Sequence, residues 1–253
     1  MRKVELKTYR QGIARAICAA AFFGSLVSTQ AAVVIEGTRI IYNESQREVN
    51  VKLGNVDEKV ATLVQIWIDE DNIDATASSS GVPFILNPPL AKIGPGKKQQ
   101  VRMVYIGENE NLKQEKLYWF NMLEVPPKSN EPSSLSFAVR TRVKLFFRPK
   151  AMNGMVPNAP ETTVWRWSST KEPFEIEAHN TSLFHMSMPS VFLEGTASPI
   201  ELSRGTMIAP NERVKFKVEG LSVPPDSAMK IRHSSLNDFG AEMFFIKNIS
   251  LTK

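Results

Sequence analysis

Residues 134–148 alternate apolar with polar or small residues at a period of two, the pattern of a β-strand with one buried face. At ~3.4 Å per residue this segment would extend about 50 Å, whereas typical strands have only ~5–6 residues. The sequence therefore predicts one unusually long strand in the middle of the chain. Its apolar face carries Leu135, Phe137, Val139, Thr141, Val143, Leu145 and Phe147.

Shorter β-rich runs lie on both sides of this segment and are separated by Pro, Gly and Asn turn signals. This spacing is typical of β-sandwiches. The pattern is interrupted at residues 151–157, where Pro and Gly indicate a linker. There is no convincing amphipathic helix, although residues 109–117 could form a turn or two. We expect an all-β protein with two domains, residues 32–152 and 153–253. The predicted strands are 33–42, 48–55, 61–69, 99–107, 117–125, 163–168, 174–180, 186–193, 214–218, 229–233 and 242–250.

Residues 1–31 have the features of a secretory signal peptide. Five Lys and Arg precede an uncharged, apolar stretch at residues 16–27, and small residues follow near Ala31. The alternative is a membrane anchor, but a dozen apolar residues are fewer than the ~20 that span a bilayer. We expect cleavage before Ala32, and no other segment long and apolar enough for stable membrane insertion.

The net charge of +5 would suggest an anionic partner such as nucleic acid. However, residues 1–31 carry five Lys or Arg against the single Glu5, so the remainder has a charge of +1. We therefore expect no nucleic-acid partner. The only cysteine, Cys18, also lies in this segment, which leaves the mature chain without a disulfide.

The sequence contains no recognisable catalytic, cofactor or metal motif. Residues 94–98 resemble a phosphate-binding loop only partly and are expected to form a turn before a strand. The three histidines are scattered, so we expect surface or partly buried roles rather than a metal site. Residues 69–71, Asp-Glu-Asp, are expected to form a solvated turn. Trp165 and Trp167 are expected to pack in a core or interface, although sugar stacking is an alternative.

Seven motifs follow one another along the chain: GTRIIY at 37–42, QIWI at 65–68, PFILNPPL at 83–90, IGPG at 93–96, YWFNMLEVPP at 118–127, VKLFFRP at 143–149 and NDFG at 237–240. Together they resemble the periplasmic chaperones of the chaperone–usher pilus pathway. The resemblance covers the whole mature chain, is weaker in the second domain, and is specific because the motifs occur in order. It implies two immunoglobulin-like sandwiches with a cleft between them, and the short connection at residues 126–133 resembles the short-loop branch.

The resemblance also implies a role for the long strand. In that family the chaperone lends a strand to a pilus subunit whose own sandwich lacks one. Leu135, Phe137 and Val139 would then fill the open groove of the subunit. The alternative is that these side chains pack in the core of this chain.

Other site residues are implied in the same way. Arg39 and Lys144 match the cleft residues that anchor the C-terminal carboxylate of the subunit. Glu115, Arg148 and Asp238 match a charge network between the two domains.

The expected protein is thus a non-enzymatic periplasmic chaperone that prevents premature assembly of pilus subunits and delivers them to an outer-membrane usher. Self-association of the free chain is possible. The alternatives are a secreted adhesin or pilus subunit, a carbohydrate-binding sandwich and, with least support, a hydrolase.

Overall fold

The computed structural model describes residues 32–76, 81–107, 112–125, 137–221 and 228–251. The predictions for residues 1–31, for the connection at 126–133 and for Leu135 lie outside these ranges. Within the described part of the chain, no helix is long and apolar enough to cross a membrane.

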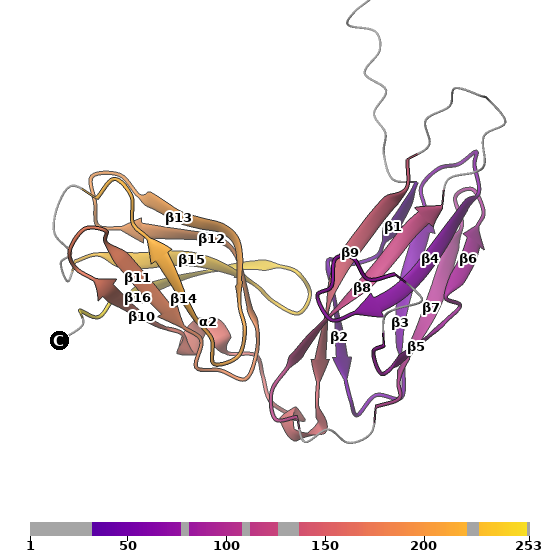
Figure 1. Ribbon diagram of the computed structural model, residues 1–253, viewed down its shortest axis with the longest axis horizontal. Coiled ribbons are helices and arrows are strands. Elements are labelled where there is room, and N and C mark those ends of the chain that lie inside the picture. The colour runs from indigo at the N-terminus through magenta and orange to yellow at the C-terminus, as the bar shows by residue number, and fades with distance from the viewer. Residues whose placement is uncertain (1–31, 77–80, 108–111, 126–136, 222–227, 252–253) are drawn as a thin grey trace, which may run out of the picture. The chain divides into compact units, whose positions relative to one another are not determined.

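The first half of the described chain forms two packed sheets (Figure 1). Apolar side chains from both sheets meet in one core, where Leu53, Met103 and Phe120 are fully buried. All pairings are antiparallel except that between β2 and β9, which is parallel. One sheet has the order β1 (Val33–Ile35), β3 (Val49–Asn55), β7 (Lys98–Tyr105), β5 (Phe84–Asn87), and the other β2 (Arg39–Asn43), β9 (Val139–Arg148), β8 (Lys116–Val125), β4 (Thr62–Asp69), β6 (Leu90–Ile93).

A 3₁₀ turn, η1 (Lys150–Met152), and a short helix, α2 (Ala159–Thr162), lead into a second pair of sheets with a separate core. Trp165 and Trp167 are almost completely buried there, which confirms the core prediction and removes the basis for sugar stacking. Met152, at the predicted boundary, packs in this second core. The sheets have the orders β10 (Val164–Ser169), β11 (Glu175–His179), β14 (Arg213–Lys217) and β13 (Ile200–Ile208), β12 (Met186–Glu194), β15 (Lys230–Leu236), β16 (Glu242–Asn248).

The predicted fold class, two immunoglobulin-like β-sandwiches, is confirmed, but several strand predictions were wrong. The single strand expected at residues 33–42 is two strands in different sheets, because the chain turns at Gly37, whose φ is +105°. Strands β5 and β6 lie on either side of Pro88 and Pro89, where the chain changes sheets. Strand β13 was missed because it is an edge strand with few buried residues and no clear apolar face.

Strand β9 is also shorter than the prediction of a strand at 134–148. It begins at Val139, and its first residue pairs with Glu124 near the end of β8. Phe137 and Ala138 lie beyond that partner and are not in a strand. A segment in which apolar and polar residues alternate forms a strand only where a neighbouring strand can hydrogen-bond with it. Since β8 ends one residue after Glu124, β9 begins there too.

His233 is the exception among the histidines, since it is 1% exposed. Its ring stacks on Phe245, with 5.3 Å between centroids, and lies 5.6 Å from the ring of Trp165. Burial lowers the pKa of His233 to about 4, so the side chain is neutral at neutral pH. It is a core residue, whereas the sequence suggested only surface or partly buried histidines.

Candidate functional site

Arg39 and Lys144 are neighbours across the parallel pair of β2 and β9. Residues in register on adjacent strands present their side chains to the same face of the sheet. The guanidinium of Arg39 lies 5.5 Å from the ring centroid of Phe146, and its Nη1 donates to the carbonyl oxygen of Leu236 at 3.1 Å. The ammonium of Lys144 lies 5.9 Å from the ring centroid of Trp119. The sheet thus holds two cations side by side.

These two cations lack a carboxylate partner among the residues that the structure describes. Burial lowers the pKa of Arg39, and burial followed by the nearby charge of Arg39 lowers the pKa of Lys144. Both shifts mean that the surroundings disfavour the charged forms in the free chain. An incoming carboxylate would reverse that penalty, because arginine offers paired donors and lysine a point charge.

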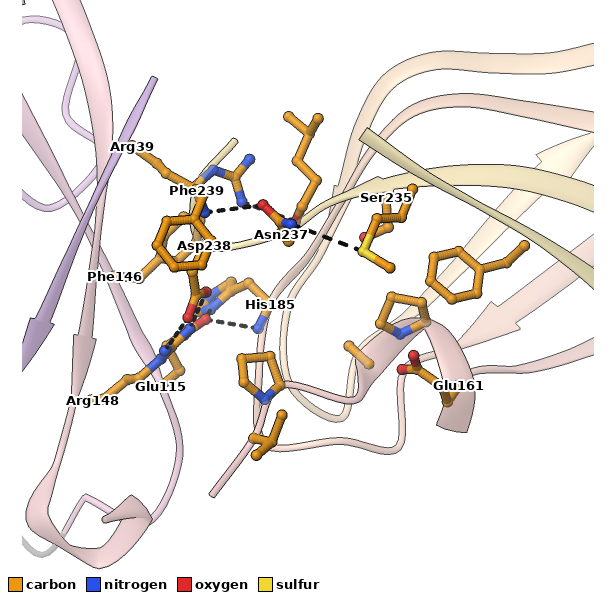
Figure 2. Close-up of a pocket in the computed structure, with 17 residues that line it drawn as sticks. Arg39, Glu115, Phe146, Arg148, Glu161, His185, Ser235, Asn237, Asp238 and Phe239 are labelled. Atoms are coloured by element: carbon orange, nitrogen blue, oxygen red, sulfur yellow. Dashed lines mark hydrogen bonds and ion pairs between the residues drawn. The ribbon is translucent and has the colours of Figure 1, made fainter. Parts of the chain in front are cut away.

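A cavity of about 210 Å³ adjoins Arg39 and is lined by residues of both sandwiches (Figure 2). Arg39 and Phe146 come from the first, while Leu236 and Phe239 come from the second. Phe239 is 95% exposed, and its backbone nitrogen donates a hydrogen bond to Asn237 Oδ1. No cluster of three metal-ligating side chains occurs in the described ranges.

Beside this cavity, Arg148 joins Glu115 and Asp238 (Figure 2). Its Nε donates to Glu115 Oε2 at 2.8 Å, and its two terminal nitrogens donate to the carboxylate of Asp238 at 2.7 and 2.6 Å. The other oxygen of Glu115 accepts from the backbone nitrogen of His185 at 2.9 Å. Attractive contacts to both carboxylates raise the pKa of Arg148 despite its burial. His185 was not anticipated, because nothing in its sequence context signals a partner 70 residues away.

The start of β9 has an unpaired edge in the described part of the chain. Residues 139–147 pair with β8 on one side, whereas β2 pairs with the other side only from Lys144 onward. The backbone of residues 139–143 is therefore free on that side to bind another strand.

The apolar face of β9 changes its surroundings along the strand. Leu145 and Phe147 are buried in the core of this chain, and Val143 is half-buried. Val139 is 38% exposed and Phe137, just before the strand, is 63% exposed. The alternative, that these side chains pack in the core of this chain, therefore holds for Leu145 and Phe147 but not for Phe137 and Val139.

The expectation that residues 69–71 form a solvated turn was wrong for Asp69. Asp69 is the last residue of β4 and is 1% exposed. Its carboxylate accepts from Arg140 at 3.1 Å, Arg142 at 2.8 Å and Asn121 at 2.8 Å. These partners compensate for its burial. The two arginines at alternate positions of a predicted strand were the available signal that a buried acid lies opposite.

Comparison with known proteins identifies relatives over most of the chain. Residues 32–153 match the family model "Pili and flagellar-assembly chaperone, PapD N-terminal domain", and residues 158–244 match "Pili assembly chaperone PapD, C-terminal domain". The chain is 36% identical to the probable fimbrial chaperone YadV of Escherichia coli K12, over 89% of this chain and 93% of the relative.

Two further matches agree with these. The chain is 31% identical to the chaperone protein FimB/FhaD of Bordetella pertussis, over 92% of this chain and 94% of that protein. Among solved structures, the YadV chaperone superposes with a TM-score of 0.72 at 32% identity, covering 86% of this chain and all of that one.

Proposed function

Since the chain belongs to the PapD-type family of pilus assembly chaperones, we propose that it holds a pilus subunit through Arg39, Lys144 and the open edge of β9. The observation that carries this proposal is the unpaired backbone at residues 139–143 beside an exposed Phe137. A strand of the subunit would pair with this edge by main-chain hydrogen bonds, while alternate side chains fill its groove.

The two cations supply the fixed point of this interaction. A carboxylate bound between Arg39 and Lys144 would place the last residue of the subunit beside the point where β2 stops pairing with β9. From there the subunit strand could run along residues 143–139, with Leu135, Phe137 and Val139 entering its groove. Burying a large apolar side chain contributes ~1.5–3 kcal/mol, so Phe137 and Val139 would stabilise the complex without ATP.

The role of the charged junction is structural in this proposal. Glu115, Arg148 and Asp238 connect the two sandwiches beside the cavity that contains Arg39. Asp238 lies just after the end of β15 at Leu236, whose carbonyl oxygen accepts a hydrogen bond from Arg39. By holding Asp238, the network would therefore fix the position of the second sandwich next to the carboxylate site.

The family and the sequence together support a proposal about the cellular context. We propose that residues 1–31 are a secretory signal, that residues 32–152 and 153–253 are the two domains, and that the mature chain works in the periplasm. The first family model begins at residue 32, which supports cleavage before Ala32. Delivery to an outer-membrane usher, self-association of the free chain and the absence of enzymatic activity are parts of the same proposal.

Phe137→Asp tests the use of the exposed apolar residue. We expect about 10- to 100-fold less subunit to co-purify from the periplasm, because a charge cannot be buried in the groove. The melting temperature of the free chain should not change, since Phe137 is 63% exposed.

Ala138→Asp is the matched control, because it introduces the same charge at an adjacent exposed residue that would face away from the groove once this segment pairs as a strand. It should retain most of the bound subunit. Equal losses in the two variants would show only a charge effect, and unfolding of Phe137→Asp alone would place that residue in the core.

A further inference from the structure

Three cations occupy alternate positions on one face of β9. Arg140, Arg142 and Lys144 have the spacing that places their side chains on the same side of the sheet. This is the face on which Lys144 lies beside Arg39. A carboxylate that approaches the strand could, by charge alone, bind at any of the three.

Asp69 forms ion pairs with two of these three cations, Arg140 and Arg142. Its Oδ2 lies 3.1 Å from Arg140 Nη2 and its Oδ1 lies 2.8 Å from Arg142 Nη2. Its side chain is 2% exposed, so solvent ions do not compete with it effectively.

The two arginines are also held by packing. The guanidinium of Arg140 lies 4.8 Å from the ring centroid of Trp67, and that of Arg142 lies 4.5 Å from the ring of Trp119. Asn121 accepts from Arg140 and donates to Asp69, which closes the cluster. In contrast, the ammonium of Lys144 has no carboxylate within ion-pair distance among the described residues.

The difference between the paired arginines and Lys144 matters for the register of an added strand. The alternation of apolar and polar side chains does not by itself fix that register. A slip of one residue turns every apolar side chain to the wrong face. A slip of two residues, about 6.8 Å along the strand, keeps every side chain on its correct face. Some other feature must exclude the two-residue slip, and the distribution of free cations can do so.

We propose that Asp69 is a positioning residue that sets the register of the bound subunit. Its carboxylate is shared by Arg140 and Arg142, so that Lys144 and Arg39 form the anion site of this face that has no carboxylate partner among the described residues. This inference rests on the proposed function, because it concerns the place at which the subunit carboxylate is held.

The test is a rescue experiment with a pilus subunit that co-purifies with the unmodified chain. Lys144→Ala should remove binding. Adding Asp69→Asn should free Arg142 as a replacement site and return about tenfold more complex than Lys144→Ala alone. A merely structural role predicts the opposite, since loss of a buried carboxylate would weaken binding further. No rescue in a folded Asp69→Asn/Lys144→Ala chain would overturn the proposal.

Asp71→Asn is the matched control, because this carboxylate is 75% exposed and lies 3.9 Å from Arg142. Combined with Lys144→Ala it should give no rescue, and equal rescue would reduce the effect to general charge. If Asp69→Asn/Lys144→Ala fails to fold, the test uses the chain that also carries Arg140→Gln. This variant leaves only Arg142 free, and it should show the same rescue. Adding Arg142→Gln should then abolish the rescue, and its persistence would contradict the proposal.

The register can also be read directly. The sole cysteine is Cys18, so a single cysteine at Ala138 of the secreted chain can be cross-linked to a series of subunit cysteines. The preferred partner should move by two subunit residues in Asp69→Asn/Lys144→Ala, and an unmoved partner would contradict the proposal. Failure of the unmodified chain to bind, or normal binding by Lys144→Ala, would instead refute the proposed function.

Discussion

Lys144→Ala is expected to reduce the amount of co-purified pilus subunit about 100-fold, equivalent to about 3 kcal/mol, while the chain remains folded. The ammonium group is half-buried beside Arg39, and its pKa is lowered by burial and by that neighbour. A bound carboxylate relieves both penalties, so the loss should fall on the complex. The free chain loses no ion pair with a described residue, and its melting temperature should change little.

Arg39→Ala should weaken the complex to a similar extent, with a small additional cost to the free chain from the lost hydrogen bond to Leu236. Lys92→Ala is the control, because Lys92 is an exposed cation on β6 of the same sheet. Pull-down from the periplasm and the melting temperature of the free chain report on both properties. Normal subunit binding by Lys144→Ala and Arg39→Ala would refute the carboxylate site.

Arg148→Ala is expected to lower the free energy of unfolding by about 3 kcal/mol, because removal of one partner leaves buried charge uncompensated. Glu115 has 2% of its side chain exposed and would lose the hydrogen bond from Arg148 Nε. Asp238, at 32% exposed, would be rehydrated at a lower cost. Most of the effect should therefore come from Glu115.

Urea unfolding followed by tryptophan fluorescence measures this loss in both sandwiches, since Trp67 and Trp119 lie in the first and Trp165 and Trp167 in the second. Arg204→Ala is the control, because it breaks only an exposed ion pair with Glu201 and should cost less than about 1 kcal/mol. If Arg148→Ala were no more destabilising than Arg204→Ala, the network would have no structural role.

The local pattern of the sequence was sufficient to predict the fold class. Period-two alternation reports which side of a strand is buried, and it correctly placed Leu145 and Phe147 on the core side of β9. It did not report where pairing stops, because that depends on the length of β8, which ends at Val125. It also missed β13, whose residues are mostly not buried.

The sequence pattern predicted less of the site than of the fold. Arg39 and Lys144 lie far apart in the sequence and become neighbours only through the parallel pairing of β2 and β9. They were expected only through the resemblance to a family, as were Arg148 and Asp238, which lie 90 residues apart. Asp69 was misinterpreted because local context placed it in an acidic turn, whereas its partners Arg140 and Arg142 are on another strand.

Hydrogen exchange of the backbone amides at residues 137–143, in the free chain and in its complex with a pilus subunit, shows whether a subunit strand pairs with the open edge of β9. Among the described residues, one side of this segment has no pairing strand in the free chain. We expect alternate amides there to exchange rapidly in the free chain and to become strongly protected in the complex, because an added strand would hydrogen-bond to them. Unchanged exchange at these amides in a stable complex would show that the subunit does not pair with this edge.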